Sequence, residues 1–212
     1  MIAEASAADT GHMQPTITIT PSVLYFGSQV LLLSTLMPDG ATNITPISSG
    51  WALGDSYVLG LGLNGQAARN LALHDRLVIN IPDASQVDAV ERIAPTTGAR
   101  EVPAAKRARF RHEPDKWTLG GFTPRASELV RPVRIAECPV QMEAAVTRTT
   151  PVGVDGEAVA VEVRVLRTHA HAAIVEQGTS HIDLRAWRPM YYTFRHYIAQ
   201  GEEVGVSFRA EQ

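Results

Sequence analysis

The sequence has few of the features that would indicate a secreted, membrane-spanning or hydrolytic protein. Cys138 is the only cysteine among 212 residues, which excludes a disulfide within the chain and fits a reducing cytoplasm. No histidine lies beside it in the sequence, so we expect a buried, unreactive thiol rather than a nucleophile. A G-x-S-x-G segment is also absent, and a hydrolase with a serine nucleophile elbow is therefore not indicated.

Long hydrophobic runs are absent as well. No segment reaches the roughly 18 uninterrupted apolar residues of a transmembrane helix, so we expect no membrane association. Residues 1–15 contain neither the basic region nor the apolar stretch of a signal peptide, and we expect them to form a flexible tail. Together with the single cysteine, these features predict a cytoplasmic protein.

The charged residues show no excess of basic side chains. The chain has 19 Lys and Arg against 22 Asp and Glu, a formal net charge of −3. Proteins that bind nucleic acid usually need a basic surface to neutralise phosphates, so no nucleic-acid partner is expected. At 45% hydrophobic residues the chain can bury a core, and its length predicts one domain over residues 16–212.

Short strand patterns separated by turn residues dominate the chain. Strands are predicted at residues 16–20, 30–36, 41–46, 57–63, 77–81, 140–148 and 157–171. Helices are predicted at residues 67–74, with Asn64 as the N-cap, and at 85–94, capped by Asp83 or Ser85. Many strands, few helices and hairpin turns favour an antiparallel barrel over alternating strands and helices.

Two segments resist a simple assignment. Residues 95–139 are rich in proline and predict an irregular insertion with at most a short helix; their basic cluster at 106–111 is expected to be solvated surface. The segment 188–198 interleaves aromatic and cationic residues, a pattern that can stack bases. The net charge argues against that use, and we favour a barrel-closing strand or a dimer contact.

The segment Gly60-Leu-Gly62-Leu-Asn64-Gly65 is a G-x-G-x-x-G motif between a predicted strand and a predicted helix. With Asp83 downstream it imitates a dinucleotide-binding fingerprint, in which the acid would hold a ribose hydroxyl. The rest of the chain lacks the alternating strands and helices that such a fold needs. A helix N-terminus after a glycine-rich strand nevertheless remains a favourable place for a phosphate group.

Small polar residues precede that motif, at Ser34-Thr35 and throughout residues 43–51. Such side chains can hydrogen-bond an oxygen-rich planar heterocycle. They are also ordinary turn and strand-end residues, so composition alone leaves the two interpretations open.

The order of these motifs resembles the flavin reductase-like, FMN-binding split-barrel family, which includes flavoredoxin-like proteins. The similarity extends from about residue 21 to residue 211. The residues that carry it are Ser34-Thr35, Asp39-Gly40, Asn43-x-x-Pro46-x-Ser48-Ser49, the glycine-rich strand, Asn70-Leu71, Val78 to Pro82, Asp115-Lys116-Trp117, Gly121, Glu137 to Val140, Pro189, Tyr192, Tyr197 and Gly205.

The resemblance implies a mainly β, antiparallel Greek-key split barrel with a few peripheral helices, working as a homodimer with FMN at the subunit interface. It implies an FMN-dependent NAD(P)H:flavin oxidoreductase in which NADH or NADPH gives hydride to flavin N5, with a flavin-dependent monooxygenase as a conceivable recipient of reduced flavin. Two alternatives stay open: a flavin carrier without turnover, and a split barrel that uses its pocket for a specialised substrate reaction.

The resemblance also assigns cofactor contacts, with residues 43–49 on the isoalloxazine and ribityl and residues 62–70 around the phosphate. Gly65 and Ala67 stand where the family usually carries hydroxyl groups, and Gln66, Arg69 or Lys116 could compensate. The expected contacts are Ser34, Thr35, Asn43, Pro46, Ser48, Ser49, Trp51, Gly62, Asn64, Gly65, Gln66, Ala67, Arg69, Asn70 and Lys116.

The histidines are the remaining candidates. His169 and His171 would lie on one strand face, but no acid or cysteine completes a recognised metal-binding spacing, so no metal is expected. A histidine that orients the nicotinamide is the more natural role, and His169, His181 and His196 are equal candidates for it.

Overall fold

The computed structural model describes residues 14–208 and is mainly β-structure. The principal strands are β1 (Phe26–Gln29), β2 (Leu31–Leu36), β3 (Thr42–Ile47), β4 (Gly50–Leu53), β5 (Ser56–Gly62), β6 (Arg76–Ile81), β11 (Val140–Val152), β12 (Ala158–Ala170), β13 (Met190–Thr193) and β14 (His196–Ala199). Two-residue strands are β7 (Thr96–Thr97), β8 (Arg111–His112), β9 (Pro124–Arg125) and β10 (Arg134–Ile135). The helices are α1 (Gln66–Leu73), α2 (Val87–Ile93), α3 (Lys116–Gly120) and the short 3₁₀ turns η1 (Ala84–Gln86), η2 (Ala104–Lys106) and η3 (Ala172–Ile174).

Seven strands form one sheet in the order β3-β2-β6-β11-β12-β5-β4, and every neighbouring pair is antiparallel. The two edge strands, β3 and β4, are consecutive in the chain and only Ser48 and Ser49 separate them. Because so short a link spans about 10 Å, the sheet must curl until its two edges meet. The predicted mainly β, antiparallel split barrel is confirmed.

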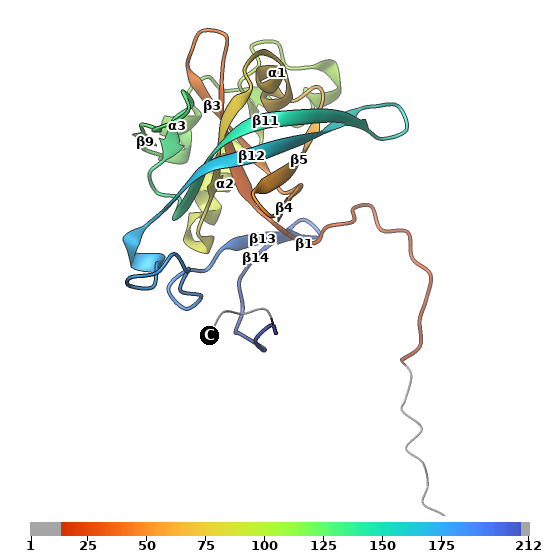
Figure 1. Ribbon diagram of the computed structural model, residues 1–212. Helices are drawn as coiled ribbons and strands as arrows, with labels where there is room; N and C mark the ends of the chain where they lie inside the picture. Colours follow the sequence, from red (N-terminus) through yellow and green to blue (C-terminus); the bar gives the residue numbers. More distant parts are fainter. Residues whose placement is uncertain (1–13, 209–212) are drawn as a thin grey trace, which may run out of the picture.

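Figure 1 shows how the other elements surround this barrel. The β11–β12 hairpin crosses its front, α1 lies at the top, and a small sheet of β1, β13 and β14 lies below. None of the helices within residues 14–208 is long and apolar enough to span a membrane.

The sheet is buried on both faces, which explains the continuous apolar run in β2. Leu31 and Leu33 point into the barrel interior with Leu59 and Ile79, whereas Leu32 faces a second cluster beneath α2 and α3. Alternate residues of one strand therefore enter different cores. Cys138 lies in the second cluster, 0% exposed, so the prediction of a buried thiol is confirmed, and burial raises its pKa.

Three local predictions were wrong or incomplete. Residues 16–20 form no strand; Ile17 is exposed and the segment has no partner strand to pair with. The N-cap of α1 is Gly65, not Asn64, and it makes no side-chain capping bond. Asp83 does cap, but it caps η1, and the expected helix at 85–94 divides into η1 and α2.

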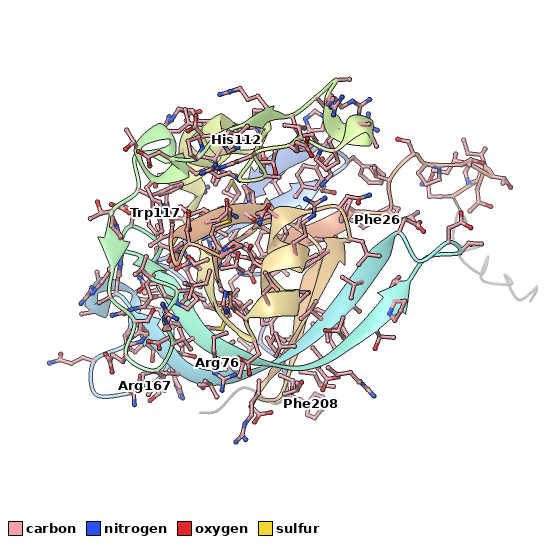
Figure 2. The ribbon with its side chains drawn as sticks, turned by 90° about the horizontal axis from the view of Figure 1, so that it is seen from above. Phe26, Arg76, His112, Trp117, Arg167 and Phe208 are labelled. Atoms are coloured by element: carbon pink, nitrogen blue, oxygen red, sulfur yellow. The ribbon has the colours of Figure 1, made fainter. Side chains whose placement is uncertain are left out.

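Between α2 and β11 the chain forms only short elements that pack along the barrel. Trp117 of α3 donates from its indole nitrogen to the Thr42 carbonyl at 2.8 Å, and Arg92 of α2 donates to the carbonyls of Leu119 and Gly120. Figure 2 looks down onto α1 and shows this segment, in green, with His112 and Trp117 along one side of the barrel. The insertion is therefore tied to both β3 and α2.

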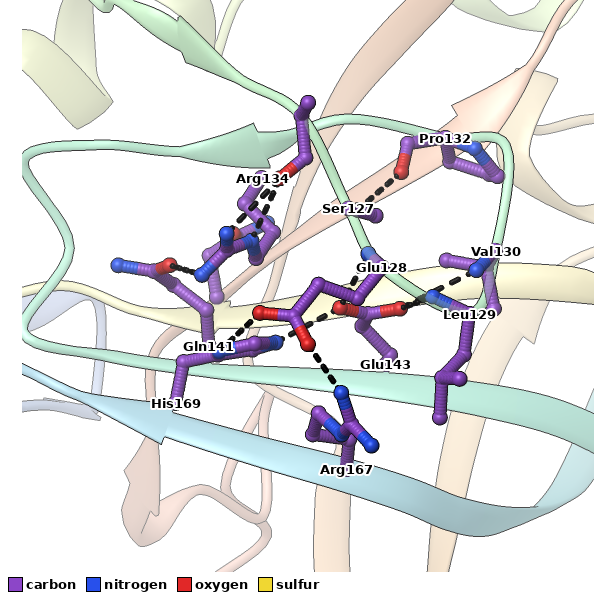
Figure 3. A network of polar contacts seen from close by, with 12 residues as sticks. Ser127, Glu128, Leu129, Val130, Pro132, Arg134, Gln141, Glu143, Arg167 and His169 are labelled. Carbon is purple, nitrogen blue, oxygen red and sulfur yellow. Dashed lines mark hydrogen bonds and ion pairs between the residues drawn. The ribbon is translucent and has the colours of Figure 1, made fainter.

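A buried carboxylate organises the end of this insertion (Figure 3). Glu143 of β11 is fully buried and accepts hydrogen bonds from the backbone N–H groups of Glu128, Leu129 and Val130 and from His169. Burial alone would raise the pKa of Glu143, but these donors outweigh it and lower the pKa below its ordinary value. Glu128 also pairs with Arg167 of β12, so two acids, Glu143 and Glu128, hold the loop against the β11–β12 hairpin.

Replacing Glu143 by glutamine is expected to lower the free energy of unfolding at pH 7 by about 2–3 kcal/mol, because an amide cannot accept all of these bonds. The folded pKa of Glu143 lies below its unfolded value of about 4.3, so its contribution is present above that value and is lost as the pH falls through the folded pKa. Urea unfolding should show that the difference in free energy of unfolding between the wild type and Glu143→Gln becomes smaller at low pH. The exposed Glu176→Gln is the control, and an equal loss there would contradict the account.

Candidate functional site

The link between β3 and β4 lies where the edges of the barrel meet. The carbonyl of Ser49 accepts from the N–H of Gly60 at 2.7 Å, and the hydroxyls of Ser49 and Tyr25 share a hydrogen bond of 2.8 Å. A Cβ on Gly60 would lie 2.8 Å from the Cβ of Ser49. The glycine-rich strand therefore lets β5 approach the link closely, which is a packing reason for the glycine at position 60.

The expected contacts Ser34, Thr35 and Asn70 are 0% exposed. Asn70 of α1 donates to the hydroxyl of Thr35 at 2.9 Å, and Asn80 of β6 donates to the hydroxyl of Ser34 at 3.0 Å. In the structure these side chains join α1 and β6 to β2, and their contact with a cofactor stays a prediction. The sequence analysis missed Asn80, which also accepts from the backbone of Ile135 at 2.9 Å.

The start of α1 carries the next group of expected contacts. Gly62 and Gly65 close a tight turn, with the N–H of Gly65 donating to the carbonyl of Gly62 at 2.8 Å. The first N–H groups of a helix have no partner within it, and here they follow that turn directly. Gln66 is half-buried and donates to Asn70 at 2.8 Å, which steadies its side chain beside the helix start.

Ala67 is one of the two positions at which the resemblance implied a missing hydroxyl group. Its side chain is 1% exposed and packs in the barrel interior. A hydroxyl group at this position would face the apolar core of the barrel. Asn43 of β3 is also buried, donates to the Thr45 hydroxyl at 2.9 Å, and lies where a Cβ on Gly98 would come within 2.5 Å of its amide oxygen.

The two lysines of the insertion, Lys116 and Lys106, differ in the partners of their ammonium groups. Lys116 is 3% exposed and donates to the carbonyls of Ile44 at 2.9 Å and Thr96 at 3.4 Å. Burial lowers its pKa to about 8, with Glu113 opposing and Lys106 adding to that shift. Lys116 therefore fastens the insertion to β3, and its ammonium group is already partnered by carbonyl oxygens.

Lys106 was expected to be solvated surface, and the structure places it beside the start of α1. Its ammonium nitrogen lies 3.8 Å from the point where a Cβ on Gly65 would stand. No sequence signal identifies this contact, because 40 residues and an irregular segment separate the two positions. Arg69, on the helix itself, is a second cation near Lys106. The pKa of Lys106 is lowered mainly by burial and further by the charge of Arg69.

Two hollows flank the link. One, of about 570 Å³, is lined by Ser49 and Trp51 together with Tyr25 and Gly60. The other, of about 240 Å³, is lined by Pro46 and Ser48 with aromatic side chains from the insertion and the small sheet: Phe110, Tyr192 and Tyr197. The expected ring contacts thus lie along one strip of chain, and Trp51 is 57% exposed.

The histidine candidates separate in the structure. His169 donates to the carboxylate of Glu143 at 2.7 Å and belongs to the network that holds the insertion. His196 is exposed at the start of β14 and lines a hollow of about 740 Å³ with Tyr192 and Tyr197. His181 lies in the loop after η3. No group of three metal-ligating side chains is found within residues 14–208.

The structure thus combines an antiparallel barrel, a two-residue link between its edge strands, and a cation near the start of α1. A family model described as "Flavin reductase like domain" matches residues 23–199. Uncharacterized protein YdfE of Bacillus subtilis (strain 168) is 41% identical over 194 residues, covering 91% of this chain and 93% of that protein. The chain belongs to the flavin reductase-like family, and the resemblance stated from the sequence is confirmed.

Solved structures show the same fold at low sequence identity. Flavoredoxin of Desulfovibrio vulgaris (Miyazaki F) matches with a TM-score of 0.75 and 17% identity, over 93% of this chain and 99% of that one. Flavoredoxin from Methanosarcina acetivorans gives 0.74 and 16%, over 92% and 97%. Nitrilotriacetate monooxygenase component B from Bacillus cereus gives 0.70 and 18%, over 92% and 100%.

Gly60→Ala should lower the free energy of unfolding by about 1–3 kcal/mol, because its methyl group would push β5 away from Ser49. Gly62→Ala is the matched control on the same strand, since a Cβ there meets nothing within 4 Å, and its effect should stay within about 1 kcal/mol. Urea unfolding of the two variants measures the difference. Equal losses would contradict the close approach at the link.

Proposed function

We propose that this protein is an FMN-dependent NAD(P)H:flavin oxidoreductase that holds FMN in the groove along residues 46–51 and the start of α1. The observations that carry the proposal are the small polar strip at residues 46–51, which is tied to Gly60 of β5, and the two cations near the start of α1, the helix that follows β5. Membership of the flavin reductase-like family supports it.

The residues present fit a phosphorylated flavin. The strip offers hydroxyl groups at Ser48 and Ser49 and backbone groups for the ring and ribityl chain, whereas unpaired N–H groups of α1 and the cations Lys106 and Arg69 suit a phosphate. A neutral ligand would have no use for two cations that are not neutralised by a neighbouring acid. The donor set therefore favours a ligand with a polar ring at one end and an anion at the other.

The chain's own residues would bind and orient, while FMN, when bound, supplies the hydride acceptor at N5. The strip at residues 46–51 would hold one edge of the flavin ring, because the backbone of Ser49 in this strip is tied to Gly60. Tyr25 and Trp51 cover the adjoining hollow and would exclude water from it. His181 and His196 remain the candidates for orienting the nicotinamide, since the ring of His169 is held by Glu143.

Anaerobic addition of FMN to the purified protein should produce a bound flavin spectrum, and NADH or NADPH should then bleach it within the mixing time. Free FMN with the same nucleotide is the control and should bleach far more slowly. Bound flavin that keeps its colour with either nucleotide would favour the alternative of a carrier. Failure to take up flavin would overturn the proposal.

A homodimer with flavin at the interface is also proposed. Trp51, Leu24 and Val152 are exposed apolar side chains around one hollow, and Leu53 is 74% exposed two residues from Trp51 on the same face of β4. An apolar patch of this kind indicates a protein contact. A second copy would cover the patch and complete the wall of the groove.

Light scattering should give a mass of twice 22.9 kDa for the protein, and Leu53→Glu should shift it toward the monomer because a carboxylate would be buried unpaired. Leu184→Glu, at another exposed leucine, should leave the mass unchanged. A monomeric wild-type protein would contradict the dimer.

We also propose a cytoplasmic setting and a partner. The buried free Cys138 and the absence of a disulfide fit a reducing cytoplasm. The structural match to a protein named as a monooxygenase component B supports a flavin-dependent monooxygenase as the partner that consumes the reduced flavin. Another protein that consumes reduced flavin would also fit this proposal.

A further inference from the structure

The hairpin of β13 and β14, in the small sheet below the barrel (Figure 1), turns through two residues in a strained backbone conformation. Phe194 and Arg195 connect the two strands, and their φ angles are 44° and 68°. A residue with a side chain disfavours this left-handed region, and glycine or asparagine is usual at both positions of such a turn. Within residues 14–208, every other positive φ belongs to a glycine. The sequence therefore keeps two bulky residues where they cost stability.

Packing accounts for Phe194 but not for Arg195. The ring of Phe194 lies edge-on against the ring of Phe26 in β1, with centroids 4.7 Å apart. Arg195 is exposed, and its guanidinium group donates to the hydroxyl of Ser22 at a long 3.5 Å. Strained residues cluster at sites where proteins bind ligands. Arg195 is therefore a candidate for contact with a ligand.

Arg195 lines a hollow of about 740 Å³ whose wall carries a second arginine. The other lining residues include Arg109 of the insertion, His196, and the tyrosines of the small sheet, Tyr192 and Tyr197. Arg109 is exposed as well. In the part of the chain that the structure describes, neither guanidinium group forms an ion pair with a carboxylate.

Glu91 of α2 also lines this hollow, but its carboxylate already has a partner. The hydroxyl of Tyr197 donates to it at 2.6 Å. Burial and the charge of Glu91 raise the pKa of Tyr197, so this hydroxyl keeps its proton at neutral pH. Two arginines thus face one acid, and the excess of positive charge favours an anionic ligand.

The hollow is continuous with the proposed flavin strip. The smaller hollow of about 240 Å³ reaches Pro46 and Ser48 in that strip. Both hollows are lined by the same three residues: Ala94, Tyr192 and Tyr197. The two tyrosine rings lie edge to face, with centroids 5.6 Å apart. A ligand can therefore extend from the flavin strip across aromatic rings to the two arginines.

These features fit a ligand with a flat ring at one end and an anionic group at the other. A nicotinamide dinucleotide has this form, and its adenine ring can stack on a tyrosine or on a guanidinium plane. NADH and NADPH both contain the pyrophosphate, whereas only NADPH carries a phosphate monoester on the adenosine ribose. Arginine is well suited to that group, because its planar guanidinium donates paired hydrogen bonds to a phosphate.

We propose that Arg195 and Arg109 determine the choice of hydride donor in this protein by binding the 2′-phosphate of NADPH, so that NADPH is preferred over NADH. This inference rests on the proposed function, because it assumes that a nicotinamide nucleotide reduces a flavin held at residues 46–51. It goes further in selecting one of the two donors and in giving the strained β13–β14 turn a role.

The test is the anaerobic reduction of FMN by NADPH and by NADH, measured as kcat/KM for the wild type and four variants. Arg195→Asn removes the charge and suits a positive φ, so it should fold at least as stably as the wild type, whereas Arg195→Lys keeps the charge. Arg109→Gln removes the second cation. Arg107→Gln is its matched control, because Arg107 is exposed in the same segment and donates to the Val102 carbonyl at 3.0 Å.

The wild type should show a kcat/KM for NADPH at least about tenfold above that for NADH. Arg195→Asn and Arg109→Gln should each lower the NADPH value about tenfold, mainly through KM, and change the NADH value less than about twofold. Arg195→Lys should keep most of the preference, and Arg107→Gln should keep all of it. The preference of the wild type should become smaller at high salt.

A second measurement needs no turnover. Isothermal titration calorimetry with adenosine 2′,5′-bisphosphate and with 5′-AMP compares the nucleotide parts of NADPH and NADH. The wild type should bind the bisphosphate more tightly, and Arg195→Asn should remove most of that difference.

Several results would overturn the inference. They are equal use of the two donors by the wild type, a preference for NADH, or an unchanged preference in both Arg195→Asn and Arg109→Gln. An equal loss of both donors in Arg195→Asn would also count against it, because the turn would then shape the site without recognising the 2′-phosphate. If neither donor reduces the flavin, the proposed function fails, and the calorimetry still decides the arginine contact: equal binding of the two nucleotides would exclude it.

Discussion

The two-residue link of Ser48 and Ser49 is the constraint on which the rest of the structure depends. It joins the opposite edges of a seven-stranded sheet, so the sheet can only exist as a closed, split barrel. Closure brings β5 against the link and requires a residue without a side chain at position 60. It also sets the β5–α1 turn beside the same opening, because that turn follows directly from the strand that contacts the link.

The site is supported from behind by buried polar side chains and from one side by the insertion. Asn70 and Asn80 hold α1 and β6 to β2, and Lys116 fastens the insertion to β3. Glu143 secures the far end of the insertion to the β11–β12 hairpin. These contacts hold the insertion against the barrel and the β11–β12 hairpin.

The strands and the barrel were predictable because period two and turn residues are local signals, as in the 157–171 segment and its hairpin. The roles of Ser34 and Thr35 were not, because β2 is buried on both faces and its sequence does not tell which side a polar residue meets. Ala67 was assigned by resemblance, which does not report that its methyl group faces the core. The position of Lys106 beside Gly65 could not be predicted, because an irregular insertion has no periodicity that would indicate it.

The central claim is that the opening at the 46–51 link holds a flavin whose phosphate meets the start of α1 and the insertion. A crystal structure of the protein soaked with FMN tests this most directly. The account predicts density for the isoalloxazine along Pro46 to Ser49 and for the phosphate within hydrogen-bond distance of the Lys106 ammonium group. Flavin density at a different surface, or a phosphate directed away from Gly65 into solvent, would contradict it.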